Sequence, residues 1–184
     1  PGFPKPSFYL ARREEKNEDF WLYVGCNSHG CSGPEDILNP DLVIDRAAAY
    51  NVAFPWMAWR YQARGILYYN TVEAYGHDFL SPWQDPFLFT GYGEGNLFYP
   101  CKPEICGGKD QFPIASLRLK VLRQGLEDVQ LLTMAEKKST EVREWVQKLI
   151  PNSRKFPTEM SEDEKIKIKA LEVLDKKENK KNSP

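Results

Sequence analysis

The sequence predicts an α/β fold with parallel strands, and three observations lead to that prediction. The expected elements follow the order strand, helix, strand, loop, strand, helix, which is the order of βαβ units. The expected strands are short and apolar along their whole length, as in a parallel sheet that is covered on both faces. Leu, Lys and Glu dominate residues 113–184, whereas most Gly, Cys and aromatic residues precede them. We therefore expect strands and loops first and helices afterwards.

Three apolar runs predict the strands. Residues 20–26 read Phe-Trp-Leu-Tyr-Val-Gly-Cys, residues 66–71 read Ile-Leu-Tyr-Tyr-Asn-Thr, and residues 97–99 form a short third strand that Pro100 closes. Aromatic and β-branched residues in such short runs are typical of strands. Gly, Pro, Asn and Ser crowd the loop that follows the first strand, and a long aromatic loop separates the second strand from the third.

The helix between the first two strands is expected over residues 45–63. Asp45 is a candidate N-cap, and Trp56 and Trp59 recur at helical spacing. Pro55 lies inside this helix and removes a backbone donor. Gly65 lies where a left-handed cap residue is common.

The helical part of the chain begins near Ser116 and has three amphipathic segments. The first runs to about residue 138, and the second covers residues 142–150. Ser161 and Glu164 have the spacing of a capping box for the third, after which residues 176–184 are expected to be a frayed polar tail.

Composition indicates a soluble globular protein and excludes several classes. The chain has 184 residues, of which 41% are hydrophobic, and its 25 basic residues nearly balance its 26 acidic ones. This balance gives no reason to expect nucleic acid as a partner, and no apolar run reaches the length of a membrane span. No glycine-rich phosphate loop follows a strand, so no nucleotide cofactor is expected. Both a doubly wound sheet and part of a (β/α)8 barrel fit the order of elements.

The four cysteines form two pairs of equal spacing, Cys26-x4-Cys31 and Cys101-x4-Cys106. Each pair directly follows a predicted strand. This spacing is compatible with two short disulfides, with free thiols, or with a structural zinc site held by four thiolates or by three thiolates and His29. The sequence leaves these alternatives open.

The usual catalytic constellations are missing, and we predict no catalytic residue in this chain. The two histidines lie in loops, and no nucleophile elbow is present. The adjacent acidic pairs lie before a strand, in a loop or on helices, rather than after a strand where a barrel enzyme places its carboxylates. Glu73 and Asp78 follow the second strand as isolated candidates.

Rings mixed with amides and carboxylates follow the second strand, which favours sugar recognition. Aromatic rings contact the apolar face of a sugar, and amides and carboxylates bind its hydroxyls. The candidate substrate-binding residues are Tyr69, Asn70, Glu73, Tyr75 and Trp83.

Three segments resemble, in order, the catalytic domain of glycoside hydrolase family 123, formerly domain of unknown function 4091. Residues 56–69, which read WMAWRYQARGILYY, are similar to the family pattern W-L-A-W-K-Y-G-A-D-G-L-Y-W. Residues 98–100 and 113–128, FYP and PIASLRLKVLRQGLED, are similar to Y-P and P-x-x-S-x-R-L-E-x-L-R-D-G-I-E-D, and residues 21–26 are similar to W-x-Y-V-C. The resemblance runs from about Phe20 to Glu136.

The resemblance implies a (β/α)8 barrel and a retaining β-N-acetylgalactosaminidase. In that mechanism the acetamido oxygen of the substrate attacks the anomeric carbon, an Asp orients the amide, and an adjacent Glu protonates the leaving oxygen. No position here corresponds to that Asp-Glu pair. Tyr69 also stands where the family usually has Trp, and Gln124 where it often has Asp. The matched Arg118, Arg123, Glu127 and Asp128 are expected to fix a helix against its neighbours.

We therefore expect an α/β chain that is the C-terminal part of a (β/α)8 TIM-type barrel, followed by C-terminal helices. Residues 1–138 would supply the last three β/α units, and residues 139–184 would be appended helices and tail. Since the chain begins at Pro1 without Met, we expect a piece of a longer protein.

Three further expectations follow for ligands, partners and location. The ligand would be a glycan or amino sugar, with no metal or cofactor. The partner would be the missing N-terminal half of the barrel or a second copy covering the open strand edges. The family, and weakly the paired cysteines, favour a secreted or periplasmic protein. The rival hypothesis is a non-catalytic carbohydrate- or partner-binding module, or less favourably a zinc-stabilised one.

Overall fold

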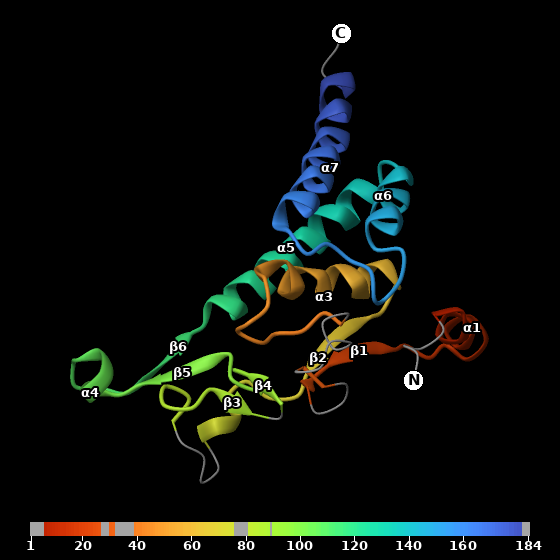
Figure 1. Cartoon of the computed structure of the whole chain (residues 1–184). Helices are drawn as coiled ribbons and strands as arrows, with labels where there is room; N and C mark the ends of the chain where they lie inside the picture. The colour runs from red at the N-terminus through yellow and green to blue at the C-terminus, as the bar shows by residue number, and fades with distance from the viewer. Residues whose placement is uncertain (1–5, 27–29, 32–38, 76–80, 89, 182–184) are drawn as a thin grey trace.

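The computed structural model describes residues 6–26, 30–31, 39–75, 81–88 and 90–181 (Figure 1). Its helices are α1 (Pro6–Lys16), α3 (Ala48–Arg60), the short α4 (Pro103–Cys106), α5 (Leu117–Glu136), α6 (Glu141–Leu149) and α7 (Met160–Lys181), with a 3-10 turn η2 (Glu73–Tyr75). Its strands are β1 (Trp21–Val24), β2 (Gly65–Tyr68), β3 (Phe87–Leu88), β4 (Gly91–Tyr92), β5 (Phe98–Cys101) and β6 (Phe112–Ala115).

A βαβ unit at the start of the chain confirms the expected parallel pairing. β1 and β2 pair in parallel with Trp21 opposite Gly65 and Val24 opposite Tyr68, and α3 is the crossover between them. The predicted burial of both faces is wrong. Leu22 and Val24 are buried, whereas Trp21 is 62% exposed and Tyr23 also faces solvent. One face of this sheet packs on α3 and the other is open.

The predicted barrel is wrong. Among the described residues the strands form three separate two-stranded sheets, β1–β2, β3–β4 and β5–β6, and only the first is parallel. β5 was expected to be the third parallel strand, yet it pairs antiparallel with β6, with Cys101 opposite Phe112. Gly107 and Gly108, both at positive φ, lie in the connection that brings the chain back. β5 therefore satisfies its hydrogen bonds within a local hairpin.

Helix α3 is the centre of the hydrophobic core and lies between the β1–β2 sheet and α5 (Figure 1). Its residues 51–59 are all buried, and Pro55 is accommodated inside the helix. The predicted N-cap is wrong: the helix begins after Ala47, and no side chain caps it. Gly65 is also not a cap residue, because Gln62 takes the left-handed conformation and Gly65 begins β2.

The three C-terminal helices pack together through apolar stripes, as expected. Leu132 of α5, Val146 of α6 and Ala170 of α7 are fully buried in the same core. Ser116 caps α5 by accepting a hydrogen bond from the backbone N–H of Leu119, 3.2 Å away. In the part of the chain that the structure describes, none of the helices is both long and apolar enough to cross a membrane.

Two expectations at the C-terminal helix are wrong. Ser161 is not its cap, because α7 already begins at Met160. The helix then continues to Lys181, so residues 176–181 are helical rather than a frayed tail. In Figure 1 this helix projects away from the strands.

Candidate functional site

The residues that follow β1 and β2 lie on one side of the parallel sheet. The two strands run in the same direction and pair from Trp21 to Val24. The segments that follow β1 and β2 therefore leave the sheet at the same end. Cys26 follows the first strand, and Tyr69 and Asn70 follow the second. The side chains of Tyr68, Asn70, Glu73 and Glu94 lie at this shared end.

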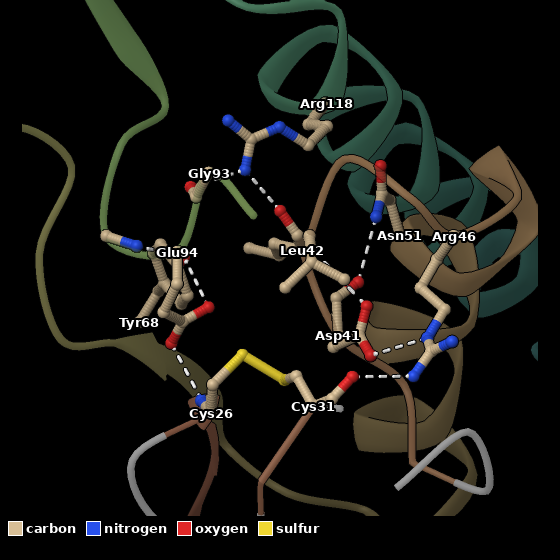
Figure 2. Close-up of a disulfide and its surroundings, with 12 residues drawn as sticks. Cys26, Cys31, Asp41, Leu42, Arg46, Asn51, Tyr68, Gly93, Glu94 and Arg118 are labelled. Carbon is tan, nitrogen blue, oxygen red and sulfur yellow. Dashed lines mark hydrogen bonds and ion pairs between the residues drawn. A yellow bond between two sulfur atoms is a disulfide. The ribbon is translucent and has the colours of Figure 1, made fainter. Parts of the chain in front are cut away.

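Glu94 is the central buried acid at this end of the sheet (Figure 2). Its side chain is fully buried and accepts hydrogen bonds from the Cys26 backbone N–H at 2.8 Å and from the Tyr68 hydroxyl at 3.1 Å. The Tyr68 hydroxyl accepts in turn from the backbone N–H of Gly95 at 2.7 Å. Burial raises the pKa of Glu94 and the pKa of the Tyr68 hydroxyl.

Glu94 is not among the residues predicted from the sequence, although its neighbours carry a signal. Gly93 and Gly95 flank it and both have positive φ, 76° and 71°. Glycine takes positive φ without steric cost, so two such glycines indicate a tight turn around the acid between them. A Cβ at Gly95 would collide with the Tyr69 hydroxyl and lie 2.9 Å from the Cβ of Glu73. The loop can therefore approach these side chains only because position 95 has no side chain.

Arg118 is the buried cation facing this acid (Figure 2). From the first turn of α5 its guanidinium donates to the backbone carbonyl of Leu42, to that of Gly93 at 2.7 Å and to that of Asn96. It also donates to the Tyr99 hydroxyl at 3.3 Å. Its positive charge opposes the effect of burial on the pKa of Glu94. Arg118 thus has the architectural role that was expected, because it joins two loops, one containing Leu42 and the other containing Gly93 and Asn96, to helix α5.

A second buried acid, Asp41, lies on the other side of the Cys26–Cys31 disulfide (Figure 2). It pairs with Arg46 at 3.4 Å, and Arg46 also donates to the carbonyl of Cys31 at 2.9 Å. Burial is the main cause that raises the pKa of Asp41 to about 6. The negative charge of Glu94 also contributes to raising the pKa of Asp41.

The structure brings three of the predicted sugar-binding residues together. The Asn70 amide donates to the Glu73 carboxylate, and its carbonyl oxygen accepts from the backbone N–H groups of Thr71 at 2.7 Å and Val72 at 3.0 Å. The Tyr69 hydroxyl lies against Gly95, and burial is the main cause that raises its pKa. We call Tyr69, Asn70 and Glu73 the polar cluster.

The other two predicted residues, Tyr75 and Trp83, lie around Tyr99 and Pro100. The Trp83 indole donates to the carbonyl of Pro100 at 2.7 Å, and its ring centroid is 4.8 Å from that of Tyr99. Tyr75 is in η2, two residues after Glu73, and burial together with the neighbouring Tyr99 raises its pKa to about 12. Asp78, the remaining candidate after the second strand, lies outside the described residues.

The cysteines are bonded in sequential pairs, Cys26 to Cys31 and Cys101 to Cys106. The first disulfide is buried beneath the Glu94 loop, and the second closes the turn that contains α4. A search of the described residues found no group of acidic, Cys and His side chains that could hold a metal ion. His29, which the zinc hypothesis used, lies outside those residues.

Carboxylates, an amide and the Tyr69 ring thus gather at the shared end of β1 and β2. In the comparison with known families, the model of the glycoside hydrolase 123 catalytic domain matches residues 4–135. The chain therefore belongs to this family, as its motifs suggested, and has a glycoside hydrolase-like function. A search of curated proteins gave no match.

Proposed function

We propose that this chain binds the β-linked N-acetylhexosamine of a glycan substrate through its polar cluster, as part of a retaining β-N-acetylgalactosaminidase. The observation that carries the proposal is the convergence of Tyr69, Asn70 and Glu73 around Gly95 within the family-matched region. Asn70 and Glu73 offer an amide and a carboxylate to sugar hydroxyls and to the acetamido group. The Trp83 ring, 46% exposed, offers an apolar surface to a sugar face.

The proposed chemistry is hydrolysis assisted by the acetamido group of the substrate. Among the described residues, no pair of adjacent acidic residues follows a strand. Asp163-Glu164 has the right residue types, but it lies in the first turns of α7, outside the matched region. The acid pair would therefore have to come from residues beyond those described or from a partner chain. A buried Glu94 with a raised pKa supports the cluster by holding Tyr68 and the Gly95 loop in place.

The test compares binding of two methyl glycosides by calorimetry or NMR titration. β-Methyl N-acetylgalactosaminide is expected to bind, and β-methyl galactoside, which lacks the acetamido group, is expected to bind more weakly. Glu73→Gln removes the charge but keeps the shape, so it is expected to weaken binding of the first sugar by about fivefold. Equal affinity for the two sugars, or no binding of either, would refute the proposal.

A matched control separates a local effect from a change in net charge. Glu104→Gln makes the same substitution at an exposed position on α4 and is expected to leave sugar binding unchanged. If both variants weakened binding equally, net charge and not the polar cluster would be responsible.

The rival hypothesis, a non-catalytic carbohydrate-binding module, shares this site but predicts a different outcome in a hydrolysis assay. The feature that favours it is that no carboxylate pair follows β1 or β2 in the described residues. Release of nitrophenol from a nitrophenyl β-N-acetylgalactosaminide by the chain together with its partner would favour the hydrolase. Sugar binding without release under any such condition would favour the module.

A further inference from the structure

A cavity of 280 Å³ lies where the first turns of α3 and α5 meet. It is lined by Tyr99, by residues between 44 and 51 and by residues between 116 and 121. Among them, Ala48 is the first residue of α3, and Leu117 and Arg118 are the first two residues of α5. We call this space the helix-end cavity. No residue of the polar cluster lines it, so it is a separate place in the molecule.

Both helices bring their N-terminal ends to the helix-end cavity. The first N–H groups of a helix have no partner within the helix, and the helix dipole adds partial positive charge at the same end. No side chain caps α3, whereas Ser116 caps α5 through the backbone N–H of Leu119. The backbone around the cavity therefore favours a negatively charged ligand.

Two arginines add full positive charges, and no acidic residue is among the lining residues. Arg46 donates through Nε to Asp41 at 3.4 Å and through one terminal nitrogen to the carbonyl of Cys31 at 2.9 Å. Its other terminal nitrogen has no such partner among the described residues. The hydrogen bonds of Arg118 end on neutral carbonyls and a hydroxyl. Asp41 offsets part of the charge of Arg46, so the cavity keeps a net attraction for an anion.

Asn51 contributes a buried hydrogen-bond acceptor to the same lining. The residue is 3% exposed, and its side-chain nitrogen donates to the backbone carbonyl of Asp41 at 2.8 Å. In Figure 2 its side-chain oxygen points away from that carbonyl. No hydrogen bond among the described residues uses this oxygen, and a buried acceptor favours a partner. A ligand with an N–H group would supply the donor.

The mouth of the cavity is apolar. Ile44 is 49% exposed and Leu117 is 74% exposed, and Val121 lies half-buried between solvent and the cavity. Covering such side chains with another aliphatic group removes apolar surface from water and is favourable. The ligand therefore needs an aliphatic part beside its anion and its N–H group.

The C-terminal residue of a polypeptide carries all three groups on one carbon atom: a carboxylate, a neutral amide N–H and a side chain. A free amino acid has an ammonium in place of the amide, and the two arginines would repel it. We propose that the helix-end cavity binds the C-terminal residue of a polypeptide whose last side chain is branched and aliphatic. The small volume fits one residue rather than a longer segment.

In this complex each group of the ligand meets a different part of the lining. The carboxylate binds Arg46 and the N–H groups of the first helical turns, which is a known way of capturing a chain terminus. The amide N–H donates to the side-chain oxygen of Asn51, and the side chain packs on Ile44 and Leu117. The inference concerns a polypeptide partner and does not depend on sugar binding.

The experiment is an NMR titration of the isotope-labelled chain with N-acetylleucine and with N-acetylleucinamide, in which a neutral amide replaces the carboxylate. The acid is expected to bind about tenfold more tightly, because the amide cannot form the charge-assisted hydrogen bonds. Binding should shift the backbone signals of residues 44–51 and 117–121. N-acetylglycine, which lacks the side chain, and free leucine, which carries an ammonium, are each expected to bind about fivefold more weakly than N-acetylleucine.

Leu117→Asp tests the site without disturbing the core, because position 117 is exposed. It is expected to weaken binding of N-acetylleucine about fivefold or more and to reduce the preference for the acid over the amide, since it adds a negative charge at the mouth. Far-UV circular dichroism checks that the variant folds. Leu126→Asp is the matched control, because Leu126 is an exposed leucine of the same helix and does not line the cavity.

The control variant is expected to bind every probe as the wild type does. Equal affinity for the acid and the amide overturns the proposal, and so does an equal loss of binding in the two variants. If N-acetylglycine binds as tightly as N-acetylleucine, the cavity is a general anion site and the proposal fails. Free leucine binding as tightly as N-acetylleucine, shifts confined to other parts of the chain, or no saturable binding would also refute it.

Discussion

At the scale of single residues, Arg118 holds the loops of the site to the helical core. Its guanidinium donates hydrogen bonds to three backbone carbonyls and to the Tyr99 hydroxyl, and the Arg118 side chain is almost completely buried. The planar guanidinium of arginine has five N–H donors and can reach several acceptors in different directions. A lysine ammonium is a compact point charge and cannot reach the same set of acceptors. One residue thus joins segments that lie more than 70 positions apart along the chain, since Leu42 and Arg118 are 76 residues apart.

Arg118→Lys is therefore expected to lower the free energy of unfolding by about 2 to 4 kcal/mol, because buried carbonyls lose their donors. Urea denaturation measures the change. Arg123→Lys on the same helix is the control, since that side chain is 77% exposed and forms only a surface pair with Glu127. The control is expected to change stability by less than about 0.5 kcal/mol. Equal effects of the two substitutions would contradict the role given to Arg118.

The matched motif residues on α5 thus differ in what they do. Arg118 contacts loops, and Asp128 accepts from the Trp56 indole at 3.4 Å and pairs with Lys167 at 3.1 Å. Arg123 and Glu127 form an ion pair at 3.0 Å across one turn of the exposed face. The sequence predicted helix-fixing roles for all four, and their spacing alone could not distinguish buried positions from exposed ones.

At the scale of elements, α3 and α5 pack closely where Gly125 faces α3. A Cβ at Gly125 would lie 2.6 Å from Cγ of Pro55 and 3.2 Å from the backbone of Val52. Gly125→Ala is expected to destabilise the protein by about 1 to 3 kcal/mol, because overpacking outweighs the gain of about 1 kcal/mol in helix propensity. Thermal unfolding measures it, with Gln130→Ala on the exposed face of α5 as control. A more stable Gly125→Ala variant would show that the helices can separate without cost.

The contact of α7 with α5 contains a buried acid, Asp163. It is 1% exposed, and neither of its carboxylate oxygens has a hydrogen-bond partner among the residues that the structure describes. Burial, and then the charges of Asp128 and Glu162, raise its pKa from 3.8 to about 7, against the opposing effect of Lys167. The folded chain therefore keeps a proton that the unfolded chain releases between those two pH values. The contribution of this group to stability falls as the pH rises from about 4 to about 7.

Asp163→Asn cannot ionise, so it is expected to gain stability over the wild type as the pH rises through that range. The difference should reach about 1 to 3 kcal/mol at pH 8 and shrink toward zero near pH 4. Urea denaturation at a series of pH values measures it. Glu162→Gln, the exposed neighbour, is the control and is expected to give a smaller and flatter difference. A difference for Asp163→Asn that does not depend on pH would contradict the burial of a charge.

At the scale of the whole molecule, the two disulfides differ in access to solvent. Cys26 and Cys31 are 2% and 3% exposed, whereas Cys106 is exposed beside its buried partner Cys101. Because thiol–disulfide exchange needs access of the attacking thiolate to a sulfur, mild reductant is expected to open Cys101–Cys106 first. Alkylation followed by mass spectrometry of samples taken over time reports the order. Simultaneous opening of both bonds, or prior opening of Cys26–Cys31, would contradict this prediction.

The partner of the chain stays a prediction at this scale. The open face of the β1–β2 sheet carries Trp21, Tyr23 and Leu67, and the sheet has two strands in the described part of the chain. Parallel strands are normally covered on both faces. The expected second copy, which would cover the open strand edges, stays a prediction, and the oligomeric state in solution tests it.

The sequence by itself determined the family, the parallel βαβ unit around α3 and the three C-terminal helices, because these depend on short-range periodicity and on motifs. It also placed Tyr69, Asn70 and Glu73 after the second strand. Only the tertiary structure decided that β5 pairs with β6 and not with the parallel sheet, because hydrogen-bond partners of a short apolar strand are not encoded in its own residues. Likewise, only folding brought Glu94 beneath Cys26, 68 positions earlier in the chain, since a contact at that separation depends on how the whole chain packs.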